Sequence, residues 1–205
     1  GWVMREQTMT DEMDREAIIR LMQELGRLKV LPRTGWQFRG IKFPESIADH
    51  CYRMSMLAMV LADVLAAKGV AIDASKVARM ALVHELAEAR IGDIPVVALR
   101  HLPAEAKRQA EREAVHEMLA GLGPVQAQYL ALWEEFETGN SLEAQLTRAA
   151  DKLELIFQAA DYERLGYRGL DEFWEKIGVM PSMDTHPLVR SLYDQLAGQR
   201  PKITP

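Results

Sequence analysis

The sequence predicts an all-α protein that folds as one helical domain. Apolar residues recur at helical spacing along most of the 205-residue chain, and stretches with proline and glycine interrupt this pattern. Serine or aspartate stands where several of the periodic segments begin, as expected of helix caps. No internal repeat, low-complexity tract or linker divides the chain, so we expect a single domain over residues 1–205.

The first helix is expected from Thr10 to Leu28, where apolar residues follow helical spacing. The segment KVLPRTGWQFRGIKFPES contains two prolines and two glycines, which predict a loop. A second helix opens at Ser46, which forms a capping-box pattern with Asp49, and stops at Gly69. Apolar residues occur on nearly every face of this helix, so we expect it to be central and buried.

A third helix is expected from a cap at Asp73 to the region of Gly92. Pro103 can open a fourth, highly charged helix that ends near Leu119. The remaining helices are expected at 125–139, 141–166, 170–177 and 186–196. His186 precedes a proline and is expected to begin or cap the last of these.

Composition narrows the class of protein. The net charge of −5 and the hydrophobic fraction of 48% argue against general binding of nucleic acid polymers, although a local basic pocket could still take a small phosphorylated ligand. Cys51 is the only cysteine, so no internal disulfide can form and a reducing cytoplasm is expected. Charges break the apolar runs before about 20 residues, so we expect no membrane span.

Polar residues on apolar helix faces are the main functional signal. His84 and Glu88 share a face with Val77 and Ala81, and His50 shares a face with apolar residues of the second helix. A buried polar group without a partner costs roughly 2–7 kcal/mol, so each of these groups needs a partner. A shared metal ion would satisfy imidazole and carboxylate together. Separate hydrogen bonds inside the core are the alternative, and spacing alone leaves both open.

Asp151 gives a weaker signal by pattern. It belongs to a polar stripe beside the apolar face of its helix, formed by Thr147, Asp151, Glu154 and Gln158. The pattern alone therefore predicts a solvated or salt-bridged surface residue. Cys51 is expected to fill space in the core, because no group that would activate its thiol is indicated.

Three segments, ESIADHCYRM, ALVHELAEARIGDIP and LTRAADKLELI, resemble the H…HD…D signature of HD-domain metal-dependent phosphohydrolases. LPRTGW, ALWEEFE and QAADYE are similar to segments of the YfbR/HDDC2-like 5′-deoxynucleotidase branch. The resemblance spans roughly Leu28 to Tyr162 and implies an HD-domain helical bundle, with the helices of 163–205 packed on this core.

The resemblance also implies roles for individual residues. The implied metal ligands are His50, His84, Glu85 and Asp151. Glu88 would be the catalytic carboxylate that orients or deprotonates water, and Asp93 would contact the substrate sugar or assist proton transfer. Arg33 would bind phosphate through its planar donors, and Trp36 would offer a stacking face to the nucleotide.

Two departures from the family pattern matter. Glu85 stands where the family has aspartate, and its extra methylene displaces the carboxylate by about an ångström. Glu85 could still bind the metal, turn away and leave three ligands, or mark a changed activity; we favour binding. Thr34 and Gly35 separate Arg33 from Trp36, which are adjacent in some relatives.

The resemblance implies a phosphomonoesterase that hydrolyses 2′-deoxyribonucleoside 5′-monophosphates with a divalent metal ion (Co, Mn, Zn, Fe, Ni or Mg). It also implies a homodimer with a nucleotide as its small-molecule partner. Two alternatives stay open. The protein could be an HD-domain hydrolase of another nucleotide or phosphorylated metabolite, or a weakened nucleotide-binding module because of Glu85.

Overall fold

A computed structural model describes residues 2–200, and the side chains of residues 10–200. This part of the chain is helical and contains no β-strand, only an isolated bridge between Pro32 and Ser46. The helices are α1 (Trp2–Leu25), α2 (Thr34–Gln37), α3 (Ile47–Ala67), α4 (Ala74–Val83), α5 (Glu88–Ile91), α6 (Ala104–Met118), α7 (Pro124–Thr138), α8 (Leu142–Arg164), α9 (Asp171–Gly178) and α10 (Pro187–Gly198). Short 3₁₀ turns are η1 (Gly26–Lys29), η2 (Val96–Arg100) and η3 (Pro181–Asp184). The predicted all-α class is confirmed.

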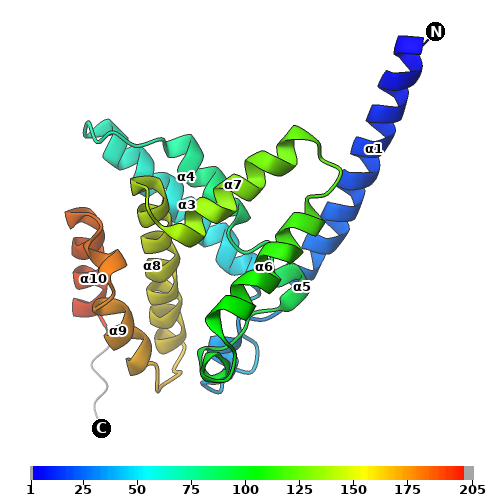
Figure 1. Cartoon of the computed structure of the whole chain (residues 1–205). Helices are drawn as coiled ribbons and strands as arrows, with labels where there is room; N and C mark the ends of the chain where they lie inside the picture. Colours follow the sequence, from blue (N-terminus) through cyan, green and yellow to red (C-terminus); the bar gives the residue numbers. More distant parts are fainter. Residues whose placement is uncertain (1, 201–205) are drawn as a thin grey trace.

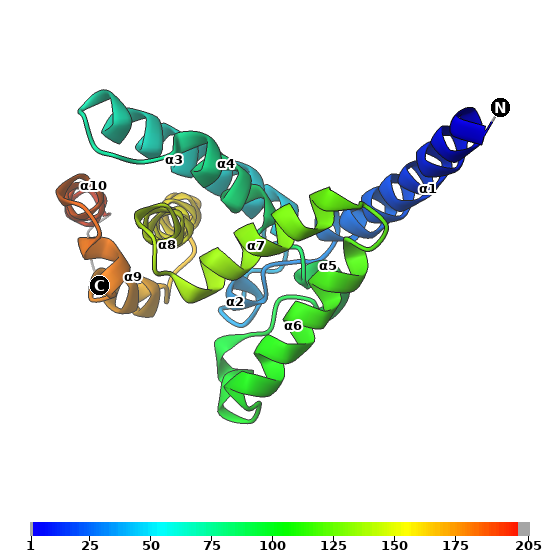
Figure 2. The same cartoon turned by 45° about the horizontal axis from the view of Figure 1, so that its top comes forward.

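The α8 helix lies at the centre of the bundle. It packs against α3 and α4 on one side, against α9 and α10 on another, and against α7 (Figure 2). Its apolar stripe is fully buried, as the 0% exposure of Leu146, Leu153 and Ile156 shows. Neighbouring helices therefore hold α8 in place on several sides.

The prediction that residues 46–69 form the central helix is wrong in one respect. The inner face of α3 packs against α4 and α8, but its outer face is exposed. The exposed apolar side chains recur at four-residue steps: Tyr52, Met56, Val60 and Val64. Pattern alone could not reveal this, because apolar residues occur on both faces and the sequence does not say which face a neighbour covers.

Among the described helices, α3 has the length and apolar composition that a membrane span would need. Core helices meet the same criterion, and here the α3 face that carries His50 is buried between α4 and α8. In this fold α3 therefore acts as a core helix.

The predicted continuous helix from Asp73 to Gly92 is broken. The α4 helix ends at Val83, residues 84–87 form a turn, and α5 follows. The His84 ring nitrogen Nδ1 lies 2.6 Å from the carbonyl of Ala81, the group that the next residue's amide would use in a continuous helix. Glu88 N then bonds to the carbonyl of Glu85, only three residues back, at 3.1 Å. The break re-aims both Glu85 and Glu88.

The predicted starts at Ser46, Asp73 and His186 are confirmed. The first helix is different, because α1 begins at Trp2 rather than at Thr10, and the segment of residues 29–46 that was predicted as a loop contains α2. Ser46 and Asp49 form a reciprocal capping box at the start of α3. The Asp73 side chain caps α4, and the His186 side chain accepts a hydrogen bond from Leu188 N at the start of α10.

An ion-pair cluster fixes α5 to the helices around it. Arg90 of α5 donates two hydrogen bonds to Glu24 of α1, at 2.6 and 2.8 Å, and one to Glu117 of α6 at 2.5 Å. The part of α1 beyond this contact reaches away from the body of the molecule (Figure 1). The Arg90 cluster therefore joins three helices beside Glu88.

Replacing Glu24 by glutamine is expected to lower the free energy of unfolding by about 1–3 kcal/mol at neutral pH, because it removes a charged, bidentate partner of Arg90. Hydrogen bonds from Arg90 lower the pKa of Glu24 below 4.5. A lowered pKa stabilises the fold above the unfolded-state pKa, and this contribution is lost as the pH falls through the folded-state pKa. Urea unfolding should therefore show a difference in the free energy of unfolding between wild type and Glu24→Gln, and this difference should shrink below about pH 4.5. A difference that is constant with pH would contradict this account.

Candidate metal centre

Side chains from three segments converge on one point. His50 comes from α3, His84 and Glu85 from the turn after α4, and Asp151 from α8. One ligand atom from each lies within 4.8 Å of all the others. His50 Nε2 lies 3.1 Å from Asp151 Oδ1, and Glu85 Oε1 lies 3.4 Å from His84 Nε2. The structure thus brings together the four residues predicted as metal ligands.

Several polar atoms at this point make no hydrogen bond. His50 Nε2, His84 Nε2 and Asp151 Oδ1 are buried without a hydrogen bond, and so is Glu88 Oε2. Each histidine is bonded through its other nitrogen, so separate hydrogen bonds in the core account for only half of each ring. Two imidazole nitrogens and two carboxylates make a donor set that suits a divalent cation. The residues present therefore fit a metal ion.

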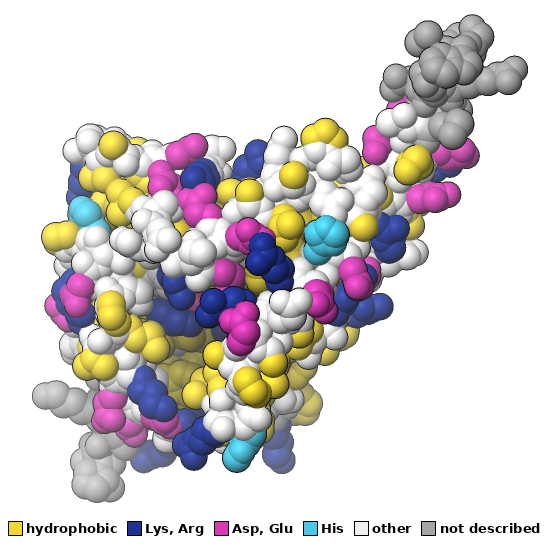
Figure 3. All heavy atoms as spheres, in the orientation of Figure 1, with side chains coloured by type: hydrophobic (Ala, Val, Ile, Leu, Met, Phe, Trp, Pro, Cys, Tyr) yellow, Lys and Arg dark blue, Asp and Glu magenta, His cyan; other side chains and the backbone are white. Residues whose placement is uncertain are grey.

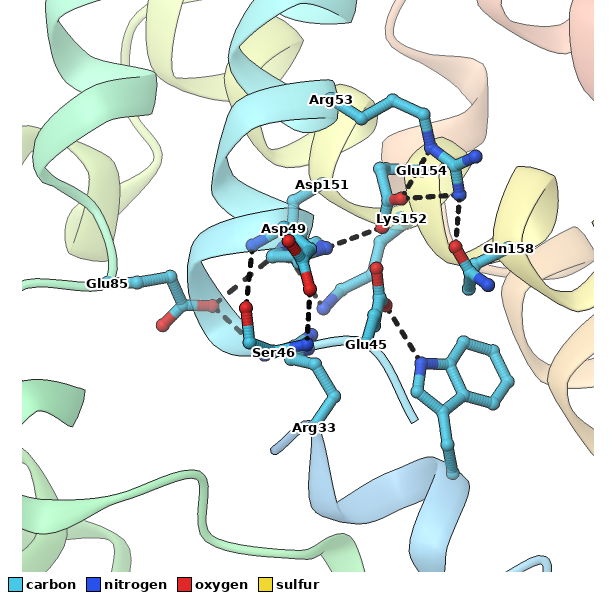
Figure 4. A network of polar contacts seen from close by, with 12 residues as sticks. Arg33, Glu45, Ser46, Asp49, Arg53, Glu85, Asp151, Lys152, Glu154 and Gln158 are labelled. Atoms are coloured by element: carbon cyan, nitrogen blue, oxygen red, sulfur yellow. Dashed lines mark hydrogen bonds and ion pairs between the residues drawn. The ribbon is translucent and has the colours of Figure 1, made fainter. Parts of the chain in front are cut away.

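An outer layer of charge orients His50. Its Nδ1 lies 2.5 Å from Glu154 Oε2, and both side chains are fully buried. Arg53 donates to the other Glu154 oxygen from Nε, at 2.8 Å, and to Gln158 (Figure 4). It also donates to Asp161. A carboxylate only accepts, so Nδ1 carries a hydrogen and Nε2 is the nitrogen that would offer its lone pair to a cation.

The protonation of His50 follows from the same neighbours. Burial and the Arg33 charge would lower its pKa, but Asp151 and Glu154 raise the pKa of His50 to about 9. A cation would therefore have to displace a proton from Nε2 when it binds.

Replacing Glu154 by glutamine is expected to weaken cobalt binding about 10- to 100-fold, because the amide no longer fixes the His50 ring through a charged acceptor. Titration calorimetry of the metal-free proteins would measure this. The matched control is Glu163→Gln, since Glu163 is also buried (3% exposed side chain) and paired with an arginine at 2.6 Å, Arg200. Equal cobalt affinity in Glu154→Gln and Glu163→Gln would contradict the role given to Glu154.

Glu85 turns toward the cluster. Its Oε1 lies 4.0 Å from His50 Nε2 and 3.2 Å from Arg33 Nη1. Burial would raise its pKa, but His84 and Arg33 overcome this and hold the pKa of Glu85 well below its usual range. Of the three outcomes considered for the longer side chain, this geometry supports binding, because the turn at 84–87 accommodates the extra methylene.

Glu88 and Asp93 border the cluster. Burial and the Glu85 charge raise the pKa of Glu88 to about 11, so this carboxylate holds a proton strongly when no cation is near. Asp93 has one oxygen committed, because its Oδ2 accepts hydrogen bonds from Thr34 N at 2.7 Å and from Thr34 Oγ1 at 3.1 Å. Its Oδ1 lies 3.9 Å from Arg33 Nη1. Asp93 thus fixes the loop that carries Arg33 and keeps one oxygen for a ligand.

The structure does not support the predicted stacking role of Trp36. Its side chain is 1% exposed, it stacks on Phe173 with ring centroids 4.4 Å apart, and its Nε1 donates to Glu45 Oε1 at 2.9 Å. A residue with its ring face already covered cannot stack on a base. Phe173 is only partly buried and lines the pocket beside the cluster, but its stacking on Trp36 covers one face of its ring.

A pocket opens beside the cluster. Figure 3 shows a hollow with hydrophobic side chains in it and Lys and Arg side chains around it, between α6 and the α8–α9 side of the molecule. Its lining includes three of the cluster residues, His84, Glu85 and Asp151. Arg33 and Lys152 also line it, and an apolar wall is formed by Val96, Leu99, Trp133, Phe136 and Phe173. The pocket therefore offers a charged end and an apolar end to one ligand.

The sequence pattern predicted wrongly that the polar stripe of α8 lies on the surface. Asp151 is 6% exposed and Glu154 is 0% exposed, not solvated surface residues. Thr147, in the same stripe, is also fully buried. The polar stripe was visible in the sequence. It indicates a buried polar network only when a partner helix is known to cover it. Nothing in the sequence pattern indicated that Arg53 or Lys152 would lie near the metal centre.

Residues 25–178 match the sequence model of the HD domain family. This chain belongs to that family. The HD-domain chain is 34% identical to human 5′-deoxynucleotidase HDDC2 over 187 residues, which cover 90% of this chain and 86% of the relative. It is 41% identical to 5′-deoxynucleotidase HDDC2 of Danio rerio over 150 residues, 72% of this chain and 70% of that one.

Two solved structures are similar to the HD-domain chain in fold and sequence. A conserved hypothetical protein from Pyrococcus furiosus gives a TM-score of 0.75 at 36% identity, over 88% of this chain and 99% of the other. A predicted metal-dependent phosphohydrolase from Magnetospirillum magnetotacticum gives a TM-score of 0.65 at 26% identity, over 92% and 95%.

Proposed function

We propose that this HD-domain protein is a metal-dependent phosphomonoesterase that hydrolyses 2′-deoxyribonucleoside 5′-monophosphates. The observation that carries the proposal is the set of four buried polar atoms that make no hydrogen bond, at and next to the charged end of the pocket. The relatives named 5′-deoxynucleotidase support the choice of substrate. The apolar wall of the pocket suits a nucleoside, and the cluster suits its phosphate.

The cation would be held by His50, His84, Glu85 and Asp151. When bound it supplies Lewis acidity, which offsets phosphate charge and can lower the pKa of water from about 15.7 toward 7. Glu88, whose Oε2 is buried without a hydrogen bond, accepts the proton of the attacking water. The Arg33 guanidinium lies within 3.9 Å of carboxylate oxygens of Glu85, Glu88 and Asp93 and balances their charge.

The metal in this proposal is a first-row transition ion such as manganese or cobalt, because imidazole and carboxylate ligands together suit these ions. The test is phosphate release from a panel of deoxy- and ribonucleoside monophosphates, with each cation added to protein stripped by a chelator. We expect turnover of deoxynucleotides that depends on the cation. Tight cation binding with no release from any nucleotide would contradict the proposed substrate, and no cation binding would contradict the centre itself.

We also propose that the protein works as a homodimer in the cytoplasm. The exposed apolar row on α3, defined by Tyr52, Met56, Val60 and Val64, supports a dimer because it offers a helix face for burial against a second copy. Sedimentation of the purified protein, compared with a Val60→Glu variant, tests this. A monomeric wild-type protein would contradict it.

A further inference from the structure

The proposed substrate brings a phosphate into a pocket that already holds several carboxylates. Three basic side chains line this pocket: Arg33, Lys107 and Lys152. Because the phosphate and the carboxylates repel, at least one of these cations has to face the phosphate together with the metal ion. Their existing partners and exposure decide which one is free to do so.

Arg33 is committed to the protein. Its side chain is 11% exposed, and its Nη1 lies 3.2 Å from Glu85 and 3.9 Å from both Glu88 and Asp93. If Arg33 moved away from these carboxylates, it would leave buried charge without a counter-ion, which is costly. Lys107 pairs with Glu111 on α6, a carboxylate outside the ligand cluster, so a cation at the cluster would leave this ion pair unchanged. Arg33 therefore serves as the counter-ion of the buried carboxylates.

Lys152 is placed differently. Its Nζ lies 2.8 Å from Asp151 Oδ2, while Asp151 Oδ1 faces His50. The Lys152 side chain is 34% exposed, and an ammonium group has three donors, of which this ion pair uses one. The side chain also borders a second hollow, which Arg148 and Asp184 line.

Binding of a cation at the cluster would make Lys152 more available to a phosphate. Once Asp151 shares its charge with the metal ion, its pull on Lys152 weakens. The ammonium group then lies beside the cluster with donors free for a phosphoryl oxygen. We propose that Lys152 is the side chain that binds the substrate phosphate, and that Arg33 holds the carboxylates in place. This inference rests on the proposed function for the identity of the substrate, but not for the binding of phosphate.

The test compares Lys152→Met with Lys76→Met. Lys76 is a matched control, because its side chain is 35% exposed and its Nζ pairs with Glu135 at 2.7 Å, outside the residues that line the pocket. We expect Lys152→Met to raise KM for the deoxynucleotide about 10-fold or more, and Lys152→Arg to restore most of the loss. Lys76→Met should leave KM within about twofold.

A second measurement needs no turnover. The affinity of the cobalt-loaded protein for inorganic phosphate, measured by calorimetry, should fall about 10-fold in Lys152→Met. Cobalt affinity without phosphate should stay within about threefold of wild type. Unchanged phosphate affinity would overturn the inference, as would a loss of cobalt affinity alone, which would make Lys152 a positioning residue for Asp151.

The two failures can be told apart. A wild-type protein that releases no phosphate from nucleotides contradicts the proposed function, yet the calorimetric comparison still decides whether Lys152 binds phosphate. A wild-type protein with full turnover and an unchanged Lys152→Met variant overturns only the inference about Lys152.

Discussion

Replacing Glu88 by glutamine is expected to lower kcat for phosphate release about 100- to 10,000-fold while the cation stays bound. That range is the usual contribution of general base catalysis. The reason lies in the placement of Glu88. Its Oε2 is buried without a hydrogen bond beside the ligand cluster, and its raised pKa marks a group with high proton affinity. A cation at the cluster opposes this rise, which lets the carboxylate ionise and receive a proton.

The control for Glu88 is Glu111→Gln. Both side chains line the pocket and both are 14% exposed, but Glu111 pairs with Lys107 on α6. Steady-state phosphate release, with cobalt content measured on the same samples, separates a chemical loss from a loss of metal. If Glu88→Gln retains both its cation and wild-type kcat, Glu88 is not the base.

Replacing Asp151 by asparagine is expected to remove most bound cation and to lower turnover in proportion. Asparagine keeps the shape of the side chain but loses the charge that two imidazoles cannot supply. Thermal unfolding gives a reading that is independent of activity. A ligand at 100 times its Kd stabilises the folded state by about 2.7 kcal/mol, so manganese or cobalt should raise the Tm of wild type.

The same addition should leave the Tm of Asp151→Asn nearly unchanged. Without added metal, the variant should be less stable than wild type, because it loses the ion pairs of Asp151 with His50 at 3.1 Å and with Lys152 at 2.8 Å. Equal rises in Tm on adding cobalt to both proteins would exclude Asp151 from the ligand set.

Local sequence predicted the helices well because their signals act over short distances. Ser46 and Asp49 lie three residues apart, and a capping box needs nothing beyond them. The break after α4 could not be predicted in this way. It follows from a side chain, His84, that takes a carbonyl of its own helix while its other nitrogen faces residues far along the chain.

The site was only partly predictable for the same reason. His50 and His84 stood out because a histidine on an apolar face is costly unless it is paired. Asp151 was placed among the ligands by resemblance alone, since its own stripe predicted a surface residue. Glu154 was missed, because the need for it arises only when His50 of α3 meets α8.

The order of residues alone determined an all-helical chain, the starts of its helices and an unusual set of polar groups on apolar faces, since backbone capping and hydrophobic periodicity are properties of neighbours in sequence. Tertiary packing decided which faces are covered, that Trp36 is a core residue rather than a platform for a base, and that Lys152 lies at the mouth of the pocket. Those outcomes depend on distances between segments, and a linear pattern does not contain these distances.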